Sequence, residues 1–277
     1  MIDEDQSTNV DPPTDEQYHL EVTAEDVAEA VLLPGDPERI ETITACWDDH
    51  SIVADHREYR TATGSYEGNA ISATSTGIGS PSAAIAVEEL ARVGAETLIR
   101  VGSCGTIQPE VEIGDLVITT GAVRQEGTSD EYVRESYPAV ADYRVVAALA
   151  AAAEELGYTY HLGVTASTDS FYAGQSRAGF EGFQARDSEA NLDELEQAGV
   201  LNFEMEASAI LTLASLYDLR AGAVCTVYAD RTTGEFRTEG EQRAARTASK
   251  AVSILARMDE QVADADGTTW HAGLGFE

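Results

Sequence analysis

Positive charge is scarce in this sequence of 277 residues: lysine and arginine total 17, and Lys250 is the only lysine. Aspartate and glutamate total 50, so the net charge is −33. Nucleic acids and anionic membrane surfaces are bound through lysine and arginine, so the composition argues against both as partners. Concentrated salt screens the self-repulsion of such a chain. The charge therefore favours a halophilic source over an acidic patch for a cationic partner.

Cysteine and long apolar runs are also scarce. Cys46, Cys104 and Cys225 are odd in number and far apart, which predicts neither a disulfide framework nor a zinc site. No apolar run reaches the length that a membrane span requires. The first residues are acidic and polar and lack the pattern of a signal peptide, so we expect a cytoplasmic protein.

Both ends of the sequence differ in composition from its middle. Residues 1–16 are acidic and contain prolines, which predicts a flexible tail. Residues 264–277 form a second loose end, in which Trp270 and Phe276 are candidate anchors to the fold. Residues 17–263 are long enough to bury a full core, and we expect them to form one domain.

Strand and helix patterns alternate along this domain. Short apolar or β-branched runs predict strands at 31–33, 71–76, 97–103, 115–122, 163–167 and 221–229. Amphipathic or alanine-rich stretches predict helices at 81–93, 143–156, 206–217 and 239–262, and Pro37 is placed to begin a further helix. This alternation predicts an α/β fold with a mixed central sheet covered by helices.

Glycine turns with arginines beside them indicate an anion site at the strand ends. Gly35 and Arg39 follow the first strand, while Arg100 and Ser103 stand at the end of another. Glycine lets backbone N–H groups approach an anion, and arginine adds charged, bidentate hydrogen bonds. Arg57, in the stretch HREY, is a further candidate. A single glycine turn is more often plain turn chemistry, but such arginines are unusual in a chain so poor in bases.

The glycines at positions 77 and 79 resemble a dinucleotide-binding loop at first sight. They follow a predicted strand and precede a predicted helix. However, Ser82 stands where the third glycine would be, and no acid follows near position 97. The sequence also contains no Walker A motif. Nicotinamide chemistry and ATP hydrolysis are therefore disfavoured.

Two carboxylates flank Met205 where a strand is expected to pass into a helix. Glu206 stands at the start of that helix, whose positive end favours a carboxylate, and apolar residues surround the pair. Most glutamate pairs in so acidic a chain lie on the surface, but this setting predicts that Glu204 and Glu206 are not fully solvated. A carboxylate that faces a cleft is suited to binding sugar hydroxyls.

Together these segments resemble the uridine phosphorylase branch of the nucleoside phosphorylase family over residues 18–258. Six stretches carry the resemblance in the family's order: LPGDPERI, DHREY, STGIGSPSAAIAVEELARVGAETLIRVGSCGTIQP, GVTASTDSFYAGQSR, NFEMEAS and VYADRT. The resemblance implies one α/β domain with a mixed, barrel-like central sheet flanked by helices. It also implies dimers that share active sites and assemble into a homo-hexamer, a trimer of dimers. With the charge, it points to a halophilic archaeon as the source.

The resemblance also implies roles for individual residues. Phosphate, the co-substrate, is implied to contact Gly35, Arg39, Arg57, Arg100 and Ser103, with Arg57 reaching it from the neighbouring subunit. The implied ribose ligands are Glu206, Met205 and His19, with His19 lent by the neighbour. Base contacts are implied for Phe171, Gln175, Arg177 and Arg231. No cofactor is required, although a potassium site at the dimer interface is implied for Glu58, Ile78 and Ser82.

The expected reaction is phosphorolysis of uridine to uracil and ribose 1-phosphate. Phosphate is itself the nucleophile, so the catalytic residues Arg100, Glu206, Gln175 and Arg177 act by positioning and by stabilising charge. A glutamine amide can pair with a carbonyl and the N3–H of uracil. An arginine can stabilise the negative charge that develops on the departing base.

A purine nucleoside phosphorylase is the main alternative. Ser103-Cys104 replaces the Thr-Thr common in bacterial uridine phosphorylases and looks like the purine branch, while Tyr228 and Ala229 stand where small apolar residues are usual. A purine enzyme of this family would use an acid to protonate N7, but Ala229 stands at the acid's place and Asp230 falls one position beyond it. A nucleosidase that uses water is disfavoured by the three arginines. A binding protein without catalysis is disfavoured because all candidate ligands are retained.

Overall fold

The computed structural model describes residues 15–265, 267 and 269–274, and ten strands and seven α-helices lie in this part of the chain. The strands are β1 (Ala30–Pro34), β2 (Asp49–His56), β3 (Tyr59–Tyr66), β4 (Asn69–Thr74), β5 (Thr97–Thr106), β6 (Leu116–Gln125), β7 (Ala139–Val140), β8 (Tyr160–Thr168), β9 (Asn202–Glu204) and β10 (Arg220–Asp230). The helices are α1 (Arg39–Thr44), α2 (Ser80–Arg92), α3 (Thr128–Tyr132), α4 (Tyr143–Glu155), α5 (Ser188–Gln197), α6 (Ala207–Leu216) and α7 (Glu241–Asp264).

Five strands close into a barrel. The sheet runs β10-β6-β8-β9-β5, and β10 also pairs with β5, which joins the two ends of this series into a ring. Three of the five pairs in the ring are parallel (β5 with β10, β6 with β8, β8 with β9), and two are antiparallel (β6 with β10, β5 with β9). From β5 the sheet continues through β1 and β4 to the β3–β2 hairpin. The expected α/β fold with a mixed, barrel-like central sheet is confirmed.

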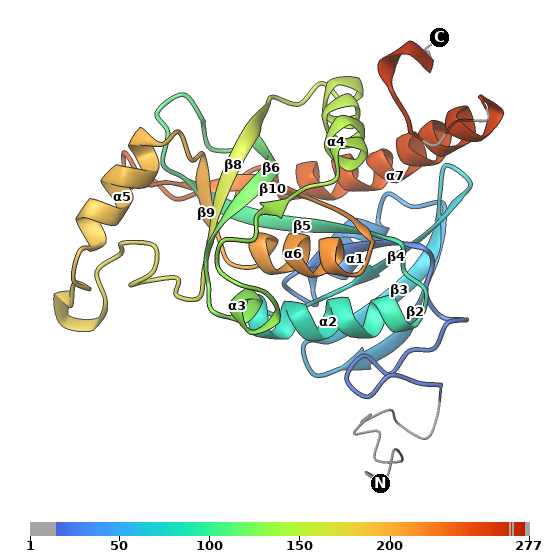
Figure 1. The fold of residues 1–277 in the computed structure, drawn as a ribbon, viewed down its shortest axis with the longest axis horizontal. Coiled ribbons are helices and arrows are strands. Elements are labelled where there is room, and N and C mark those ends of the chain that lie inside the picture. Colours follow the sequence, from blue (N-terminus) through green and yellow to red (C-terminus); the bar gives the residue numbers. More distant parts are fainter. Residues whose placement is uncertain (1–14, 266, 268, 275–277) are drawn as a thin grey trace, which may run out of the picture.

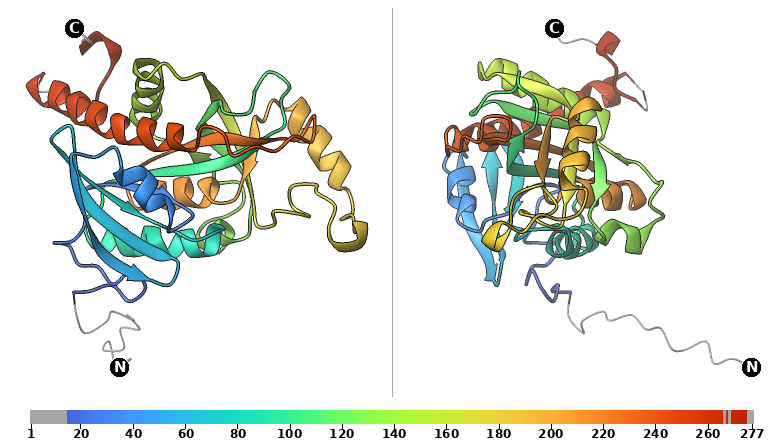
Figure 2. Two further views of the ribbon diagram at one scale, coloured as in Figure 1. Left: turned by 180° about the vertical axis from the view of Figure 1, so that it is seen from behind. Right: turned by 90° about the vertical axis from the view of Figure 1, so that its left-hand side faces the viewer.

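Helices cover the sheet on two sides (Figures 1 and 2). On one side, α1, α4 and α7 pack in an apolar cluster that includes Leu32 and Ile99. On the other side, α2 and α6 pack in a second cluster that includes Val31, Leu33 and Leu98. Successive residues of a strand point to opposite faces, so β1 and β5 contribute to both clusters. Burial on both faces explains why these strands read as continuous apolar runs in the sequence.

The predicted elements are all present, although several boundaries differ and some elements were missed. Helix α1 begins at Arg39, two residues after Pro37. The β2–β3 hairpin was missed because its strands carry Asp, His, Arg, Thr and Gly and few large apolar residues. Helix α5 is mostly acidic and polar and lies at the far end of the molecule, away from the main cores (Figure 1). Such segments lack the apolar periodicity on which sequence reasoning depends.

The two predicted tails differ in how much of each the structure describes. Residues 1–14 and Phe276 lie outside the described residues. Trp270 is buried in the α1–α4–α7 cluster, and the Tyr143 hydroxyl donates to its carbonyl at 2.8 Å. The segment after α7 is thus attached to the domain through Trp270. None of the helices described by the structure is long and apolar enough to cross a membrane.

The carboxyl ends of β1, β5 and β10 lie at the same edge of the sheet because these strands are mutually parallel. Turns that leave parallel strands at one edge bring residues from distant parts of the sequence together. Gly35 follows β1, Ser103 lies near the end of β5, and Ala229 lies near the end of β10. This edge is therefore the place where the predicted site residues can meet.

Candidate active site

A cavity of about 410 Å³ opens at this edge of the sheet. Ten of the predicted site residues line it: Gly35, Arg39, Ile78, Arg100, Ser103, Phe171, Gln175, Arg177, Met205 and Glu206. These residues come from turns after β1 and β4, from β5, from the segment after β8, and from the β9–α6 junction. The remaining predicted residues, His19, Arg57, Glu58, Ser82 and Arg231, do not line it.

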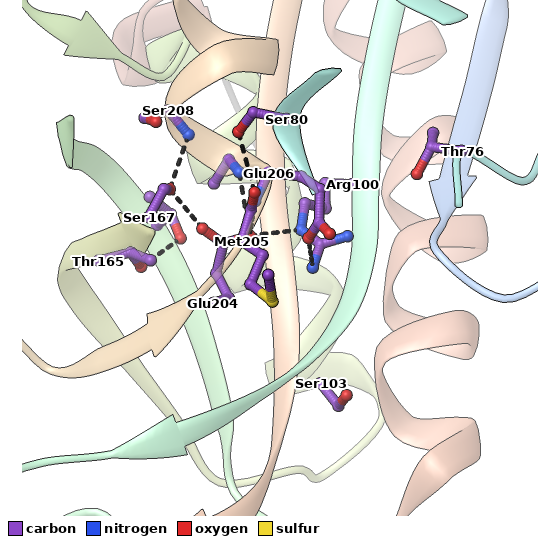
Figure 3. Close-up of polar contacts among 12 residues, drawn as sticks. Thr76, Ser80, Arg100, Ser103, Thr165, Ser167, Glu204, Met205, Glu206 and Ser208 are labelled. Atoms are coloured by element: carbon purple, nitrogen blue, oxygen red, sulfur yellow. Dashed lines mark hydrogen bonds and ion pairs between the residues drawn. The ribbon is translucent and has the colours of Figure 1, made fainter. Parts of the chain in front are cut away.

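A buried arginine pairs with two buried glutamates at one end of the cavity (Figure 3). The Nε of Arg100 donates to Oε2 of Glu204 at 2.7 Å, and its Nη2 forms an ion pair with Oε2 of Glu206. Arg100 is only 5% exposed. Burial alone would lower the pKa of Arg100, but Glu206 and Glu204 together raise it, so the guanidinium is permanently charged. Its Nη1 has no hydrogen-bond partner among the described residues.

The two glutamates have different partners. Oε2 of Glu204 accepts hydrogen bonds from the backbone N–H groups of Glu206 (2.8 Å) and Ala207 (2.9 Å), at the start of α6. Glu204, and not Glu206 as we expected, therefore faces the positive end of that helix. Glu206 instead accepts a hydrogen bond from the backbone N–H of Gly79 at 2.5 Å. Burial raises the pKa of Glu206, although Arg100 opposes the shift.

Further anion-binding groups stand beside Arg100. Nη2 of Arg39 donates to the hydroxyl of Ser103 at 3.2 Å, and its guanidinium lies 6.0 Å from the ring centre of Tyr228. Gly35 lies against the Gly77 turn, and a Cβ on Gly35 would come within 3.0 Å of the Gly77 carbonyl oxygen. A side chain at position 35 would therefore push the end of β1 away from that turn. This end of the cavity combines two arginines, a hydroxyl and a glycine turn.

The segment after β8 supplies the other end of the cavity. The guanidinium of Arg177 lies 4.4 Å from the ring centre of Phe171, and its Nε is buried without a hydrogen-bond partner among the described residues. Burial lowers the pKa of Arg177. Gln175 is 3% exposed, whereas Phe171 is 47% exposed. An amide, an arginine and an aromatic ring thus share one wall, a combination suited to a planar ring with polar edges.

Arg231 lies behind this wall and does not line the cavity. Its Nη1 donates to the carbonyl of Gln175 at 2.7 Å, and its Nη2 donates to the carbonyl of Ser176 at 3.3 Å. Burial, with Arg177 nearby, lowers the pKa of Arg231 to about 10, so it remains charged at neutral pH. Arg231 therefore fixes the backbone on which Gln175 and Arg177 stand.

Asp230, the candidate acid of the purine alternative, is engaged in a turn. Its carboxylate accepts hydrogen bonds from Thr232 (backbone N–H and hydroxyl, both 2.7 Å) and from the Thr233 hydroxyl (2.8 Å). Although burial opposes ionisation, these hydrogen bonds lower the pKa of Asp230. Ala229, not Asp230, lines the cavity. A carboxylate in this state is a poor proton donor at neutral pH.

His19 and Arg57 do not line the cavity, and His56, the neighbour of Arg57, contacts His19. Nδ1 of His19 lies 2.6 Å from Oε1 of Glu89, and His19 lines a separate hollow with Tyr18 and Glu89. Nδ1 of His56 lies 3.0 Å from the carbonyl oxygen of His19, which brings Arg57, the next residue, close to it. Arg57 is exposed. The two residues that the resemblance assigns to a neighbouring subunit thus share one face.

The predicted potassium ligands gather around Gly77. The side chains of Glu58 and Ser82 both lie against it, and Ile78 is 80% exposed. The Ser82 hydroxyl donates to the carbonyl of Gly79 at 3.2 Å, which leaves its lone pairs free. Carboxylate, hydroxyl and carbonyl oxygens suit a hard cation, so the donor chemistry fits. No cluster of three His, Cys, Asp or Glu that could hold a metal ion occurs within the described residues.

Several residues that line the cavity were not predicted from the sequence to belong to the site. Phe236 and Thr238 lie on the stretch between β10 and α7, which has no regular pattern. Asp36 and Cys104 adjoin predicted residues, and their places in LPGDP and GSCG could have signalled them. Glu204 had been considered only as the second member of a glutamate pair. The structure makes it the partner of Arg100.

Comparison with known proteins agrees with this geometry. Residues 29–258 match the family model described as the phosphorylase superfamily. A uridine phosphorylase of Thermococcus kodakarensis is 57% identical over 265 residues, which cover 95% of this chain and 96% of the relative. A uridine phosphorylase of Escherichia coli is 41% identical, covering 86% and 94%. A guanosine phosphorylase of Halorubrum lacusprofundi is 44% identical over 211 residues, covering 76% and 82%.

Proposed function

The chain belongs to the phosphorylase superfamily, and from this we propose that it is an enzyme that uses phosphate to cleave uridine into uracil and ribose 1-phosphate. The observation that supports the proposal best is that one cavity combines an anion-binding end with an end suited to a planar base. At one end stands a buried, charged Arg100, whose Nη1 has no hydrogen-bond partner in the part of the chain that the structure describes. Gln175 and Arg177 stand at the other. Relatives named as uridine phosphorylases, one of them 57% identical, support this assignment.

Phosphate is the group that best completes the Arg100 end. A buried donor without a partner is unfavourable, so an anion oxygen that accepts from Nη1 is stabilised there. Arg39, Ser103 and the Gly35 turn bind the remaining phosphate oxygens, which holds the dianion beneath the sugar. One phosphate oxygen then attacks C1′ of the ribose as the glycosidic bond breaks. No protein nucleophile is needed, because binding and orientation lower the barrier.

The ribose and the base are bound on either side of the breaking bond. Glu206 accepts hydrogen bonds from the ribose hydroxyls, and its negative charge favours the positive charge that builds on the sugar. Met205, which stands next to it in the cavity wall, packs on the sugar. Gln175 pairs with a carbonyl and the N3–H of uracil, and Arg177 stabilises the charge on its carbonyl oxygens. Phe171 packs on the ring, while Arg231 holds the loop in place.

Cleavage of a purine nucleoside is the second candidate, and the 44% identity to a guanosine phosphorylase favours it. Ser103-Cys104 in place of Thr-Thr also resembles the purine branch. Against it stands Asp230, whose carboxylate bonds to Thr232 and Thr233 and does not line the cavity. Among the described residues, the wall formed by Phe171, Gln175 and Arg177 offers a purine base no other carboxyl group to protonate N7. Uridine therefore remains the better substrate.

Further properties belong to the same proposal. His19 and Arg57, which share one surface, complete the site of a neighbouring copy in dimers that form a hexamer. Glu58, Ile78 and Ser82 would hold a potassium ion at that interface, beside the Gly77 turn. The domain comprises residues 17–263, and Trp270 attaches the segment that follows α7 to it. The charge of −33 suits the salt-rich cytoplasm of a halophilic archaeon.

Product analysis tests the proposed function. The enzyme is incubated with uridine in concentrated salt, with and without phosphate, and the products are followed by ³¹P NMR and by the ultraviolet spectrum of uracil. We expect equal amounts of uracil and ribose 1-phosphate, formed only with phosphate present. Release of free ribose without phosphate would instead identify a nucleosidase.

A further inference from the structure

We propose that Ser167 is a positioning residue for phosphate binding, because its hydroxyl orients Glu204, which in turn holds the guanidinium of Arg100. The inference rests on the proposed function, in which Arg100 binds phosphate. Ser167 lies on β8, does not line the cavity, and is fully buried. Its place in the reaction is therefore not evident from the cavity alone.

The direction of the Ser167 hydroxyl is fixed on both sides (Figure 3). Its oxygen accepts a hydrogen bond from the backbone N–H of Ser208 at 2.9 Å, in the first turn of α6. With that lone pair engaged, its hydrogen points to Oε1 of Glu204, to which it donates. A serine hydroxyl with one donor and one acceptor in place has no remaining freedom to rotate.

Glu204 depends on Ser167 for the orientation of its carboxylate. Oε2 accepts from three donors: the Nε of Arg100 and the N–H groups of Glu206 and Ala207. Ser167 provides the hydrogen bond to Oε1. A buried carboxylate oxygen without a donor is unfavourable. Loss of Ser167 therefore favours rotation of the Glu204 carboxylate, which weakens its bond to Arg100.

A second buried carboxylate, that of Glu126, extends this hydrogen-bond network beyond Ser208. The hydroxyl of Ser208 donates to Oε1 of Glu126 at 3.0 Å. Oε2 of Glu126 accepts from the backbone N–H of Ser129 at 2.9 Å, in the first turn of α3. A continuous chain of hydrogen bonds thus runs from α3 through α6 and β8 to Arg100. Buried and satisfied networks of this kind hold their members in one geometry.

Thr165 provides a matched control on the same strand. Like Ser167 it is fully buried, and its hydroxyl bonds to Asn202 of β9 at 2.9 Å and to Thr119 of β6 at 2.7 Å. It therefore makes side-chain hydrogen bonds to the same neighbouring strand but none to Glu204. A merely structural role for buried hydroxyls would affect Ser167→Ala and Thr165→Val alike.

The test compares the two variants in uridine phosphorolysis, measuring KM for phosphate and for uridine separately. We expect Ser167→Ala to raise the KM for phosphate about tenfold, as loss of one hydrogen bond to a charged group allows, with the KM for uridine changed less than about twofold. Thr165→Val should leave the ratio of the two KM values unchanged. In a Glu204→Gln background, Ser167→Ala should add no further increase in the KM for phosphate, because both act on one contact.

Equal changes in both KM values, or the same phosphate effect in Thr165→Val, would overturn the inference. If Ser167→Ala does not fold, Ser167→Cys keeps the size with a weaker donor and is read in the same way. Stabilisation of the folded protein by inorganic phosphate, followed by thermal unfolding, separates the two proposals. A wild-type enzyme that shows no phosphate-dependent cleavage would contradict the proposed function. Equal stabilisation of wild type and Ser167→Ala by phosphate would contradict only the role of Ser167.

Discussion

The two ends of the cavity are built in different ways. The Arg100 end is formed by strands of the barrel and the start of α6, where Arg100, Glu204 and Glu206 are buried and bonded to one another. The Gln175 end is formed by the segment between β8 and α5, where Phe171 is nearly half exposed and Arg231 pins the backbone. One end is fixed by the fold, and the other is carried by a loop.

This difference matches what the two ends bind. Phosphate and ribose are common to all substrates of such a reaction, so a rigid arrangement of charges suits them. The base varies, and a loop can change without disturbing the barrel. Relatives named for uridine match this chain at 57% and 41% identity, and a relative named for guanosine matches it at 44%. We therefore expect the Arg100 end to determine the rate of cleavage and the Gln175 end to determine base selectivity.

Arg100→Ala is expected to give the largest loss. Removing the central donor from the phosphate should lower kcat/KM for uridine by about 10³-fold. It also leaves Glu204 and Glu206 buried without a cation, which should lower the free energy of unfolding by about 3–5 kcal/mol. Initial rates, with circular dichroism to confirm folding, measure both effects. Arg257→Ala, at an exposed arginine of α7, is the control, and more than a tenth of wild-type activity in Arg100→Ala would refute the assignment.

Gln175→Ala should impair binding of the base at the Gln175 end of the cavity and leave the Arg100 end intact. Loss of the amide that pairs with uracil should raise the KM for uridine by about 30- to 100-fold, as expected for a buried base edge left unpaired. The KM for phosphate should change less than about twofold, because the barrel end is untouched. Gln197→Ala, at an exposed glutamine of α5, should change neither value. Equal losses for both substrates would show that the two ends are not separate.

Gly102→Ala tests how closely the barrel end is packed. A Cβ at this position would lie 2.9 Å from Nη2 of Arg100 and 2.8 Å from Sγ of Cys225, so the guanidinium must shift. We expect the KM for phosphate to rise about tenfold, with little change for uridine, because displacement by a fraction of an ångström weakens charged hydrogen bonds. Gly127→Ala has ordinary space for its Cβ and serves as the control. A KM for phosphate unchanged in Gly102→Ala would place Arg100 outside the phosphate site.

Asp230→Asn should have the smallest effect on activity. The carboxylate bonds within its own turn, so kcat/KM for uridine and for guanosine should both change less than about twofold. Its lowered pKa contributes stability that is present above pH of about 3.8 and is lost as the pH falls through the lowered value. Wild type and variant should therefore converge in acid unfolding. A collapse of guanosine cleavage alone would identify Asp230 as an acid for purines.

The barrel end could be predicted from the sequence because its residues stand at the ends of apolar strands. Gly35, Arg39, Arg100 and Ser103 follow patterns of this kind, and the structure brings them to one cavity. The partner of the helix N-terminus could not be predicted, since Glu204 and Glu206 differ only in how the chain turns at Met205. Tertiary contacts decide between them.

The loop end and the polar hairpin were less accessible to sequence reasoning. The segment after β8 has no periodicity, so Gln175 and Arg177 were assigned by resemblance, and the structure places both in the cavity. Arg231, to which the resemblance assigns a base contact, does not line the cavity, because its guanidinium donates to the loop carbonyls of Gln175 and Ser176. The β2–β3 strands carry too few large apolar side chains to be recognised.

The most direct test of the central claim is a competition between uridine and guanosine in one solution, with saturating phosphate and with phosphate omitted. We expect both cleavages to depend on phosphate, and we expect kcat/KM for uridine to exceed that for guanosine by about tenfold or more. Guanosine cleaved in preference to uridine, or uracil released at the same rate without phosphate, would contradict it.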